Sequence, residues 1–277
     1  MRTTLLLTML VATAVYADVQ ETNKTERRFT MAAGPRRLVV DNVFGSITVR
    51  AGSGNEVQFV VNEHWRADDN SAMSQARREV RLDFTQESDM VKAYVDGPFR
   101  CRNRDCGDNH RDYDVRFDFD VVVPADARLE LKTVNSGRVQ VEGTGGDFEI
   151  RNVNGAIEMK NVAGSGTART VNGGVKASFR QSPQGACEFK TVNGGVEVTV
   201  PANYSAEVSA KNLNGSILTD FEATALPIRM EDAPQRDGPR FVYRSRGGAR
   251  IRIGNGGPEH KLETLNGDIV IRKAGVQ

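Results

Sequence analysis

Histidine is scarce in this sequence, and the residue patterns of common hydrolytic sites are missing. The three histidines are His64, His110 and His260. None lies in a His-Glu-x-x-His metalloprotease motif or beside a Gly-x-Ser-x-Gly nucleophile elbow. Acidic residues alternate with Lys and Arg, as solvated strand faces do. We therefore expect no enzyme, no catalytic residue and no cofactor. The alternative is a polysaccharide-acting β-solenoid hydrolase or lyase, whose carboxylates would be brought together only by folding.

Aromatic residues and net charge are also low. Aromatic side chains make up 6% of the chain, and 37 Lys and Arg against 36 Asp and Glu leave a net charge of +1. So small a net charge provides no long-range field that would attract a polyanion. We therefore expect no nucleic-acid partner. The scattered aromatic residues Trp65, Tyr204 and Tyr243 fit a core as well as they fit a binding patch.

Cysteine occurs three times. Cys101 and Cys106 are five positions apart in a polar stretch, and a local disulfide is the expected state in an oxidising compartment. Metal binding is the weaker alternative, because no second Cys pair or His cluster completes a four-ligand site. We expect no metal. Cys187 shares the parity of Phe189 in a short alternating segment, which predicts a small buried hydrophobe.

Long hydrophobic runs are confined to the N-terminus. Arg2 precedes the apolar stretch Leu5–Val15, and Val15-Tyr16-Ala17 has the small-residue pattern of a cleavage site. This predicts a signal peptide over residues 1–17 and a mature start at Asp18. An uncleaved anchor is the alternative, but the stretch has roughly half of the ~20 residues that a span needs. We expect an exported protein, either periplasmic, on the outer surface or secreted, with no integral membrane segment after cleavage.

Glycine, in contrast, is abundant and marks a repeat. A hydrophobic residue, Asn, Gly, any residue and a β-branched residue recur in this order. The pairs are Asn154-Gly155, Asn172-Gly173, Asn193-Gly194, Asn214-Gly215 and Asn266-Gly267. Looser copies place Ser136 before Gly137, and Phe44 before Gly45, in the Asn position. Asn and Gly tolerate the positive φ that a sharp corner demands, so these pairs predict structural turns between strands.

The spacing of the glycines predicts the fold class. A glycine falls every nine residues at Gly137, Gly146, Gly155, Gly164 and Gly173, and each interval holds one short alternating strand. Two strands complete one coil, which buries its apolar side against the next coil. We therefore predict an all-β protein, a β-solenoid or β-helix-like stack of short strands. A meander of hairpins is the alternative, because Asn-Gly is also the strongest hairpin signal.

The remaining segments are less regular. Residues 18–35 are polar and predict a loosely attached lead. Residues 36–124 predict a β-rich capping region with a short helix over Ser71–Arg78. The repeat region spans residues 125–273 and is interrupted by a charged, Pro-containing loop insertion over residues 221–240. Loops on rigid scaffolds often carry binding residues, so this insertion is the expected contact site.

One strand, from Tyr113 to Val123, alternates without interruption and ends at Pro124. Its polar face carries Asp112, Asp114, Arg116, Asp118 and Asp120. We interpret this face as solvated. A calcium site is the alternative, although the sequence has no EF-hand and no Gly-rich calcium repeat.

The strand that ends in Val123-Pro124, followed by the Asn-Gly repeats, resembles the bacterial putative-adhesin family of exported domains. The resemblance covers residues 36–273. It implies a Gly-punctuated β-solenoid with a surface or envelope role, and it brings no catalytic residues with it. The Cys101–Cys106 segment and the 221–240 insertion depart from the family pattern.

The export signal and the repeat together predict an adhesin-like binding or structural scaffold of the cell envelope. Its expected partner is an envelope protein or a glycan. End-to-end self-association is a further expectation, because the final strand, Ile269–Arg272, has no evident cap beyond it.

Overall fold

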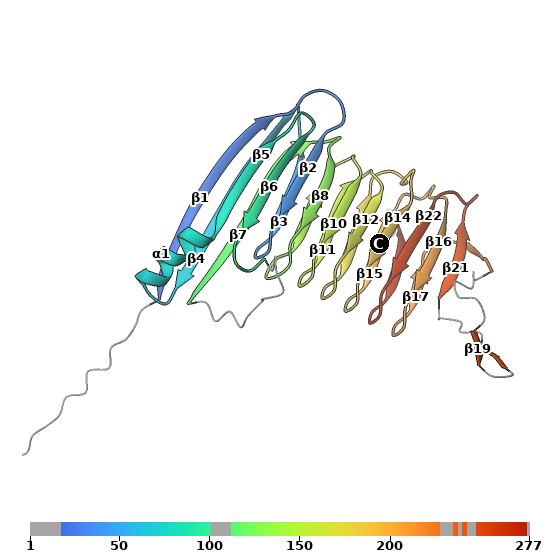
Figure 1. Ribbon diagram of the computed structural model, residues 1–277. Helices are drawn as coiled ribbons and strands as arrows, with labels where there is room; N and C mark the ends of the chain where they lie inside the picture. The colour runs from blue at the N-terminus through green and yellow to red at the C-terminus, as the bar shows by residue number, and fades with distance from the viewer. Residues whose placement is uncertain (1–17, 101–111, 228–234, 238–239, 243–247, 276–277) are drawn as a thin grey trace, which may run out of the picture.

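The computed structural model describes residues 18–100, 112–227, 235–237, 240–242 and 248–275. Two long sheets run side by side along one axis (Figure 1). In spatial order, sheet A contains β1 (Val19–Thr30), β4 (Glu56–Ala67), β7 (Tyr113–Pro124), β3 (Ile47–Gly52), β9 (Val139–Glu142), β11 (Ile157–Val162), β13 (Val175–Phe179), β15 (Val196–Val200), β23 (Ile269–Lys273) and β17 (Ile217–Thr219).

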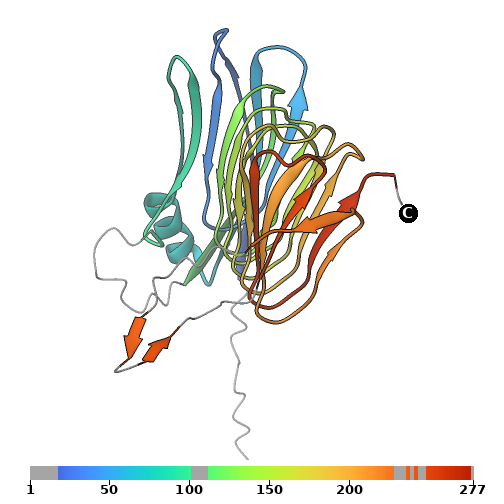
Figure 2. The same cartoon turned by 90° about the vertical axis from the view of Figure 1, so that its right-hand side faces the viewer.

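Sheet B faces sheet A across the core (Figure 2). In spatial order it contains β18 (Ala223–Ala225), β21 (Ala249–Ile253), β16 (Ala206–Lys211), β22 (Glu259–Glu263), β14 (Cys187–Lys190), β12 (Gly166–Arg169), β10 (Phe148–Arg151), β8 (Arg128–Lys132), β2 (Arg37–Asp41), β6 (Met90–Asp96) and β5 (Arg81–Gln86). A separate small sheet pairs β19 (Gln235–Asp237) with β20 (Arg240–Val242).

Parallel pairing in constant register makes the repeat region a β-solenoid. In sheet A, Ile157 of β11 lies opposite Val139 of β9 and Val175 of β13, and Val175 lies opposite Val196 of β15. In sheet B, β10 pairs in parallel with β8 and β12. Each coil therefore adds one strand to each sheet. A hairpin meander would pair consecutive strands antiparallel, so the predicted coils are confirmed and the meander is wrong.

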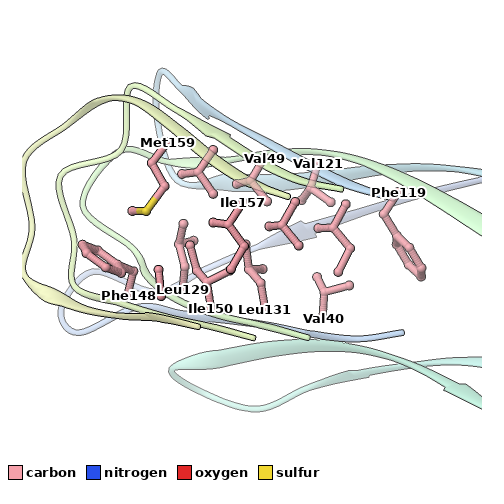
Figure 3. Packing of buried hydrophobic residues seen from close by; sticks show 14 of the residues in the cluster. Val40, Val49, Phe119, Val121, Leu129, Leu131, Phe148, Ile150, Ile157 and Met159 are labelled. Atoms are coloured by element: carbon pink, nitrogen blue, oxygen red, sulfur yellow. The ribbon is translucent and has the colours of Figure 1, made fainter. Parts of the chain in front are cut away.

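Alternation in the short strands builds the core between the two sheets. Val139 and Val141 of β9 are buried, whereas Gln140 between them is half-buried on the outer face. Ile157 of sheet A faces Ile150 and Leu131 of sheet B across the interior (Figure 3). Fully burying one such side chain stabilises the fold by about 1.5–3 kcal/mol. Small aliphatic residues suffice because each coil is covered by a neighbour on either side.

The segment expected as a loose polar lead, residues 18–35, is instead largely an edge strand. β1 has 12 residues and pairs antiparallel with β4 along its whole length. Val19 and Phe29 pack partly against the core. The expectation failed because the outer face of an edge strand is solvated, and charges such as Lys24 and Arg28 discourage pairing with another chain. Polarity here reflects a protected edge and not a lack of structure.

The predicted helix is present as α1 (Asn70–Glu79). Asp69 caps its N-terminus, because its carboxylate accepts a hydrogen bond from the backbone N–H of Ala72 at 2.7 Å. Ala72, Met73 and Ala76 are buried. The helix follows β4, and Figure 2 shows it (teal) at the base of the space between the two sheets.

The region between residues 36 and 124 shares both sheets with the repeat. β2 pairs in parallel with β8 and β6, and β3 pairs in parallel with β9 and β7. The coil made by β2 and β3 carries the Phe44-Gly45 corner, and Phe44 bridges to Asn135 of the next coil. Antiparallel strands then end the stack, with β4 and β1 in sheet A and β5 in sheet B.

The last coil of the sequence lies inside the stack. β23 pairs with β15 on one side and β17 on the other, and β22 pairs with β14 and β16. The expectation that Ile269–Arg272 is an uncapped end is therefore wrong. In spatial order, β23 lies between β15 and β17 in sheet A, and β22 lies between β14 and β16 in sheet B, although both strands come later in the sequence than β16 and β17. Among the described strands, β17 in sheet A and β18 in sheet B are the edge strands at this end.

The predicted loop insertion, residues 221–240, is only partly a loop. β18 pairs antiparallel with β21 and extends sheet B. Residues 228–234 and 238–239 lie outside the described part of the chain, so the contact site expected in this insertion stays a prediction. Residues 1–17, where the signal peptide is expected, also lie outside it. Within the described ranges, no helix is long and apolar enough to cross a membrane.

Candidate functional site

The Asn-Gly corners stack into a ladder of side-chain amides. Each Asn donates a hydrogen bond from Nδ2 to Oδ1 of the Asn in the neighbouring coil. The pairs are Asn154 to Asn135 at 2.6 Å, Asn172 to Asn154 at 2.7 Å, Asn193 to Asn172 at 2.8 Å, Asn266 to Asn193 at 2.8 Å and Asn214 to Asn266 at 2.7 Å. All five donating residues are exposed. Because an amide NH₂ group has two hydrogens, each of them keeps one for an outside partner.

Asn135, and not Ser136, takes the ladder position in the copy that contains Gly137. The sequence-based assignment of Ser136 to the Asn position is therefore wrong. This copy has one residue more between its Asn and Gly137 than the later copies. Ser136 absorbs the extra residue by adopting φ +61°.

The corner glycines are required because successive coils approach closely. Gly155, Gly173, Gly194, Gly215 and Gly267 have φ values from +139° to +158°. A Cβ atom on Gly173 would lie 2.5 Å from the carbonyl oxygen of Gly155 in the neighbouring coil. A Cβ on Gly194 would lie 2.4 Å from the corresponding oxygen of Gly173. All five predicted Asn-Gly pairs thus lie at one edge of the stack, with the glycine against the next coil and the Asn outward.

A row of buried side chains, which the sequence reasoning missed, joins several corners to a neighbouring coil. Thr170, Thr191 and Thr264 each stand two residues before a corner Asn, and each donates to a corner glycine carbonyl of the neighbouring coil at 2.7–2.8 Å. Asn152 takes the same place and donates to Gly137 at 3.0 Å. Asn212 holds the same position before Asn214, but its buried Nδ2 has no hydrogen-bond partner among the described residues. The signal was available, because Thr or Asn recurs at this offset in every copy.

The residue directly before each of these corner asparagines is Val or Leu, and several of these side chains are exposed. Val171 is 38% exposed, Leu265 is 42% exposed and Leu213 is 70% exposed. We call these three side chains, together with the asparagines of the ladder, the corner stripe. Aligned apolar side chains on a surface are typical of interaction sites. The stripe combines them with a regular row of hydrogen-bond donors.

A groove of about 600 Å³ adjoins the ladder where the repeat begins. Arg116, Arg138, Gln140 and Asn154 are among the residues that line it. Arg116 is bound to Asp118 at 2.9 Å, whereas Arg138 is an exposed cation beside Glu158. Guanidinium and amide groups are donors that suit the hydroxyl, carbonyl or carboxylate oxygens of a sugar or a peptide.

The carboxylates near this groove are ionised and engaged. The hydrogen bond from Lys160 lowers the pKa of Glu158, even though burial opposes it. Burial raises the pKa of Asp118, but hydrogen bonds from Arg116 and Ser46 outweigh it, so this pKa is also lowered. A glycosidic general acid needs the opposite shift, because it must hold a proton near neutral pH. Neither carboxylate therefore suits the general-acid role that the hydrolase alternative needs.

The polar face of β7 is solvated and ion-paired. Asp118 lies 3.6 Å from His64 as well as beside Arg116, and Asp120 lies 3.8 Å from Arg50. Across the described ranges, no three His, Cys, Asp or Glu side chains cluster as metal ligands would. The calcium alternative therefore has no ligand cluster in this part of the molecule.

A separate polar cluster lies in the core near the C-terminal coil. The hydroxyl of Tyr204 lies 2.5 Å from Nδ1 of His260, and burial lowers the pKa of His260 to about 4. Cys187 lies opposite His260 in the strand register, is 2% exposed, and burial raises the pKa of its thiol to about 11. A thiol that is buried and protonated is not a nucleophile. The prediction that Cys187 is a buried hydrophobe is confirmed.

Two aromatic residues that the sequence left undecided, Trp65 and Tyr204, are buried at 9% and 5% exposure. Tyr243 lies outside the described residues. Cys101 and Cys106 lie outside them too, so their disulfide stays a prediction.

A two-sheet β-solenoid with an amide ladder along one corner defines the class of this protein. The chain belongs to the Toastrack DUF4097 family, whose model matches residues 38–226. The resemblance to an adhesin family of unknown function is thereby confirmed. No curated protein matches the chain.

Solved structures also resemble this chain, among them the following two. One is a putative cell adhesion protein from Clostridium sporogenes, with 9% identity over 91% of this chain and 100% of that chain and a TM-score of 0.39. The other is a putative adhesin from Bacteroides fragilis, with 10% identity over 91% of this chain and 97% of that chain and a TM-score of 0.41.

Proposed function

We propose that the protein is an exported, non-catalytic scaffold of the cell envelope that binds an extended glycan or protein along the corner stripe. The observation that carries this proposal is the exposed amide ladder, in which each of the five donating asparagines has a second N–H that the ladder does not use. The expected export signal and the adhesin-like family support an envelope location.

The geometry of the ladder suits a linear partner. Neighbouring strands in a sheet lie about 4.8 Å apart, so the donors repeat at about this distance along the stack. One such hydrogen bond contributes only about 0.5–1.5 kcal/mol. A rigid row loses little entropy on binding, so several weak contacts to one extended molecule can act together. Val171, Leu265 and Leu213 add apolar contact beside the donors.

The absence of catalysis is part of the proposal. The lowered pKa values of Asp118 and Glu158 support it, as does the burial of Cys187 and His260 in the core. Asp118 and Glu158 are unsuited to act as general acids, and the buried thiol of Cys187 is unsuited to act as a nucleophile.

The test is binding of the full chain to glycan arrays, to isolated cell-wall sacculi and to envelope extract. Leu213→Ser combined with Leu265→Ser removes apolar contacts from the stripe, and both residues are too exposed to be needed for the core. Leu218→Ser is the matched control, because Leu218 is 51% exposed at the same end but lies on the outer face of β17, away from the corner. We expect the double variant to lose binding and the control to keep it. The proposal is refuted if no ligand class binds above background, or if the double variant binds as well as the Leu218→Ser control.

A further inference from the structure

A cleft of about 350 Å³ opens between the two sheets at the N-terminal end of the stack. Strands β1 and β4 form one wall, and β5 of sheet B forms the other. Helix α1 lies beside β4 and contributes Arg77 to the lining. Figure 2 shows the sheets standing apart here, since no Asn-Gly corner joins them. The cleft is far from the C-terminal part of the corner stripe and does not depend on it.

The inner part of the cleft is apolar and aromatic. Trp65 and Phe117 pack edge to face at 5.8 Å, and both are buried. Leu82 and Phe84 of β5 are half-buried opposite them. Phe84 also packs against Phe59 at 5.2 Å, which fixes the position of the second wall. These side chains form the deep part of the cleft, whereas the surface that a ligand meets first is more polar than apolar.

The charged side chains at the cleft come from β1, β4 and α1, and their partners differ. Arg77 of α1 is ion-paired with Glu21. Glu63 accepts hydrogen bonds from the Thr25 hydroxyl at 2.6 Å and from the Trp65 indole N–H at 3.3 Å, so both of its oxygens are engaged. Arg27 donates only to the backbone carbonyl of Glu26 among the contacts of the described residues, and its guanidinium lies 6.0 Å from the Phe84 ring.

The lining thus places one cation without a carboxylate partner directly beside an aromatic floor. We propose that this cleft binds a single amphipathic anion, whose carboxylate or phosphate head pairs with Arg27 and whose apolar chain lies against Trp65 and Phe84. The pairing supplies the charge-assisted hydrogen bonds that Arg27 lacks. The aromatic floor supplies the burial that a free chain would gain by leaving water.

The protein carries its own reporter for this site, because Trp65 is its single tryptophan. The experiment titrates the full chain with sodium dodecanoate below its micellar concentration and follows Trp65 emission, with calorimetry to give the stoichiometry. Glycerol monododecanoate, which has the same chain and no charge, and sodium acetate, which has the head and no chain, are the comparison ligands. We expect saturable one-to-one binding of dodecanoate alone.

Two neighbouring arginines provide matched variants. Arg27 shares the parity of Thr25 on β1 and lines the cleft, whereas Arg28 is on the opposite face of the same strand. Arg27→Gln should weaken dodecanoate binding by about tenfold, the loss of one charge-assisted contact. Arg28→Gln should leave it unchanged, and far-UV circular dichroism confirms that both variants fold. The proposal is overturned if dodecanoate does not saturate, if the uncharged ester binds as tightly, or if the two variants behave alike.

Discussion

Two adjacent glycines in one corner, Gly173 and Gly174, give a sharp test of the stacking geometry. Gly173 has φ +152°, and a Cβ there would meet the Gly155 oxygen at 2.5 Å and the Ala156 nitrogen at 2.8 Å. Gly174 is not in the positive-φ region, and the nearest atom to its Cβ is the Gly195 oxygen at 3.3 Å. The perturbation is Gly173→Ala, and Gly174→Ala is its control.

The size of the effect follows from these contacts. Backbone strain at such a φ costs about 1–3 kcal/mol for a residue with a Cβ. Forcing one extra carbon into a packed position costs about 1–3 kcal/mol more. The Gly155 carbonyl cannot easily move away, because Thr170 donates to it at 2.8 Å. We therefore expect Gly173→Ala to destabilise the fold by about 2–6 kcal/mol. Gly174→Ala should change stability by less than about 1 kcal/mol.

The assay is urea unfolding followed by far-UV circular dichroism, which reports on all coils, and by Trp65 emission, which reports on the N-terminal end. Coincident transitions would show that the stack unfolds as one unit, so that midpoints and slopes give a free energy. If the two alanine variants lost similar stability, the carbonyl contact across coils would not be what requires glycine, and the close-stacking argument would fail.

Three further outcomes are expected. Burial lowers the pKa of His260 from 6.5 to about 4, so between these pH values the unfolded chain binds a proton that the folded chain excludes. The free energy of unfolding should therefore be highest above pH 6.5 and fall by about 3 kcal/mol as the pH drops toward 4, which urea midpoints measured at several pH values would show. Thr191→Val leaves the Gly173 carbonyl without its hydroxyl donor and should cost about 1–2 kcal/mol in the same assay, whereas Thr199→Val on the outer face should cost less. The free edge of β17 should support self-association of the full chain, which sedimentation velocity would detect at high concentration and which Leu218→Lys should abolish.

The coil architecture could be predicted because corners and strands leave separate marks in the sequence. Gly173 and Gly194 mark where the backbone must pass close to a neighbour, and alternation around Val175 and Val196 marks the buried face. The helix was also readable, since Asp69 and the buried Ala72 and Met73 give it a cap and an apolar side.

The edges and the order of the coils could not be predicted. β1 is polar on its solvated side, so its composition matches that of a loose segment, and only its partner β4 distinguishes the two. The copy at Asn266 has the same pattern as the copies at Asn193 and Asn214, so nothing local shows that it lies between them. That position depends on which strand edge is free when the chain returns, which is a property of the whole stack.

The cleft was missed for a similar reason. Trp65 and Phe84 lie on different sheets, in strands separated by helix α1, and each has the pattern of an ordinary core residue in its own strand. What distinguishes these two residues from the core residues of the coils is that they line an opening between the sheets, beside Arg27.

The interior position of the last coil has a consequence for biosynthesis. A chain that emerges N-terminus first from the ribosome presents β14 and β15 with unpaired edges until β22 and β23 have been synthesised. By pairing on both sides, β22 joins β16 to β14 and β23 joins β17 to β15, so these two strands connect the last coil of the stack to the coils before it. A product truncated before residue 259 would therefore lack the joint between the two parts and remain open to proteases.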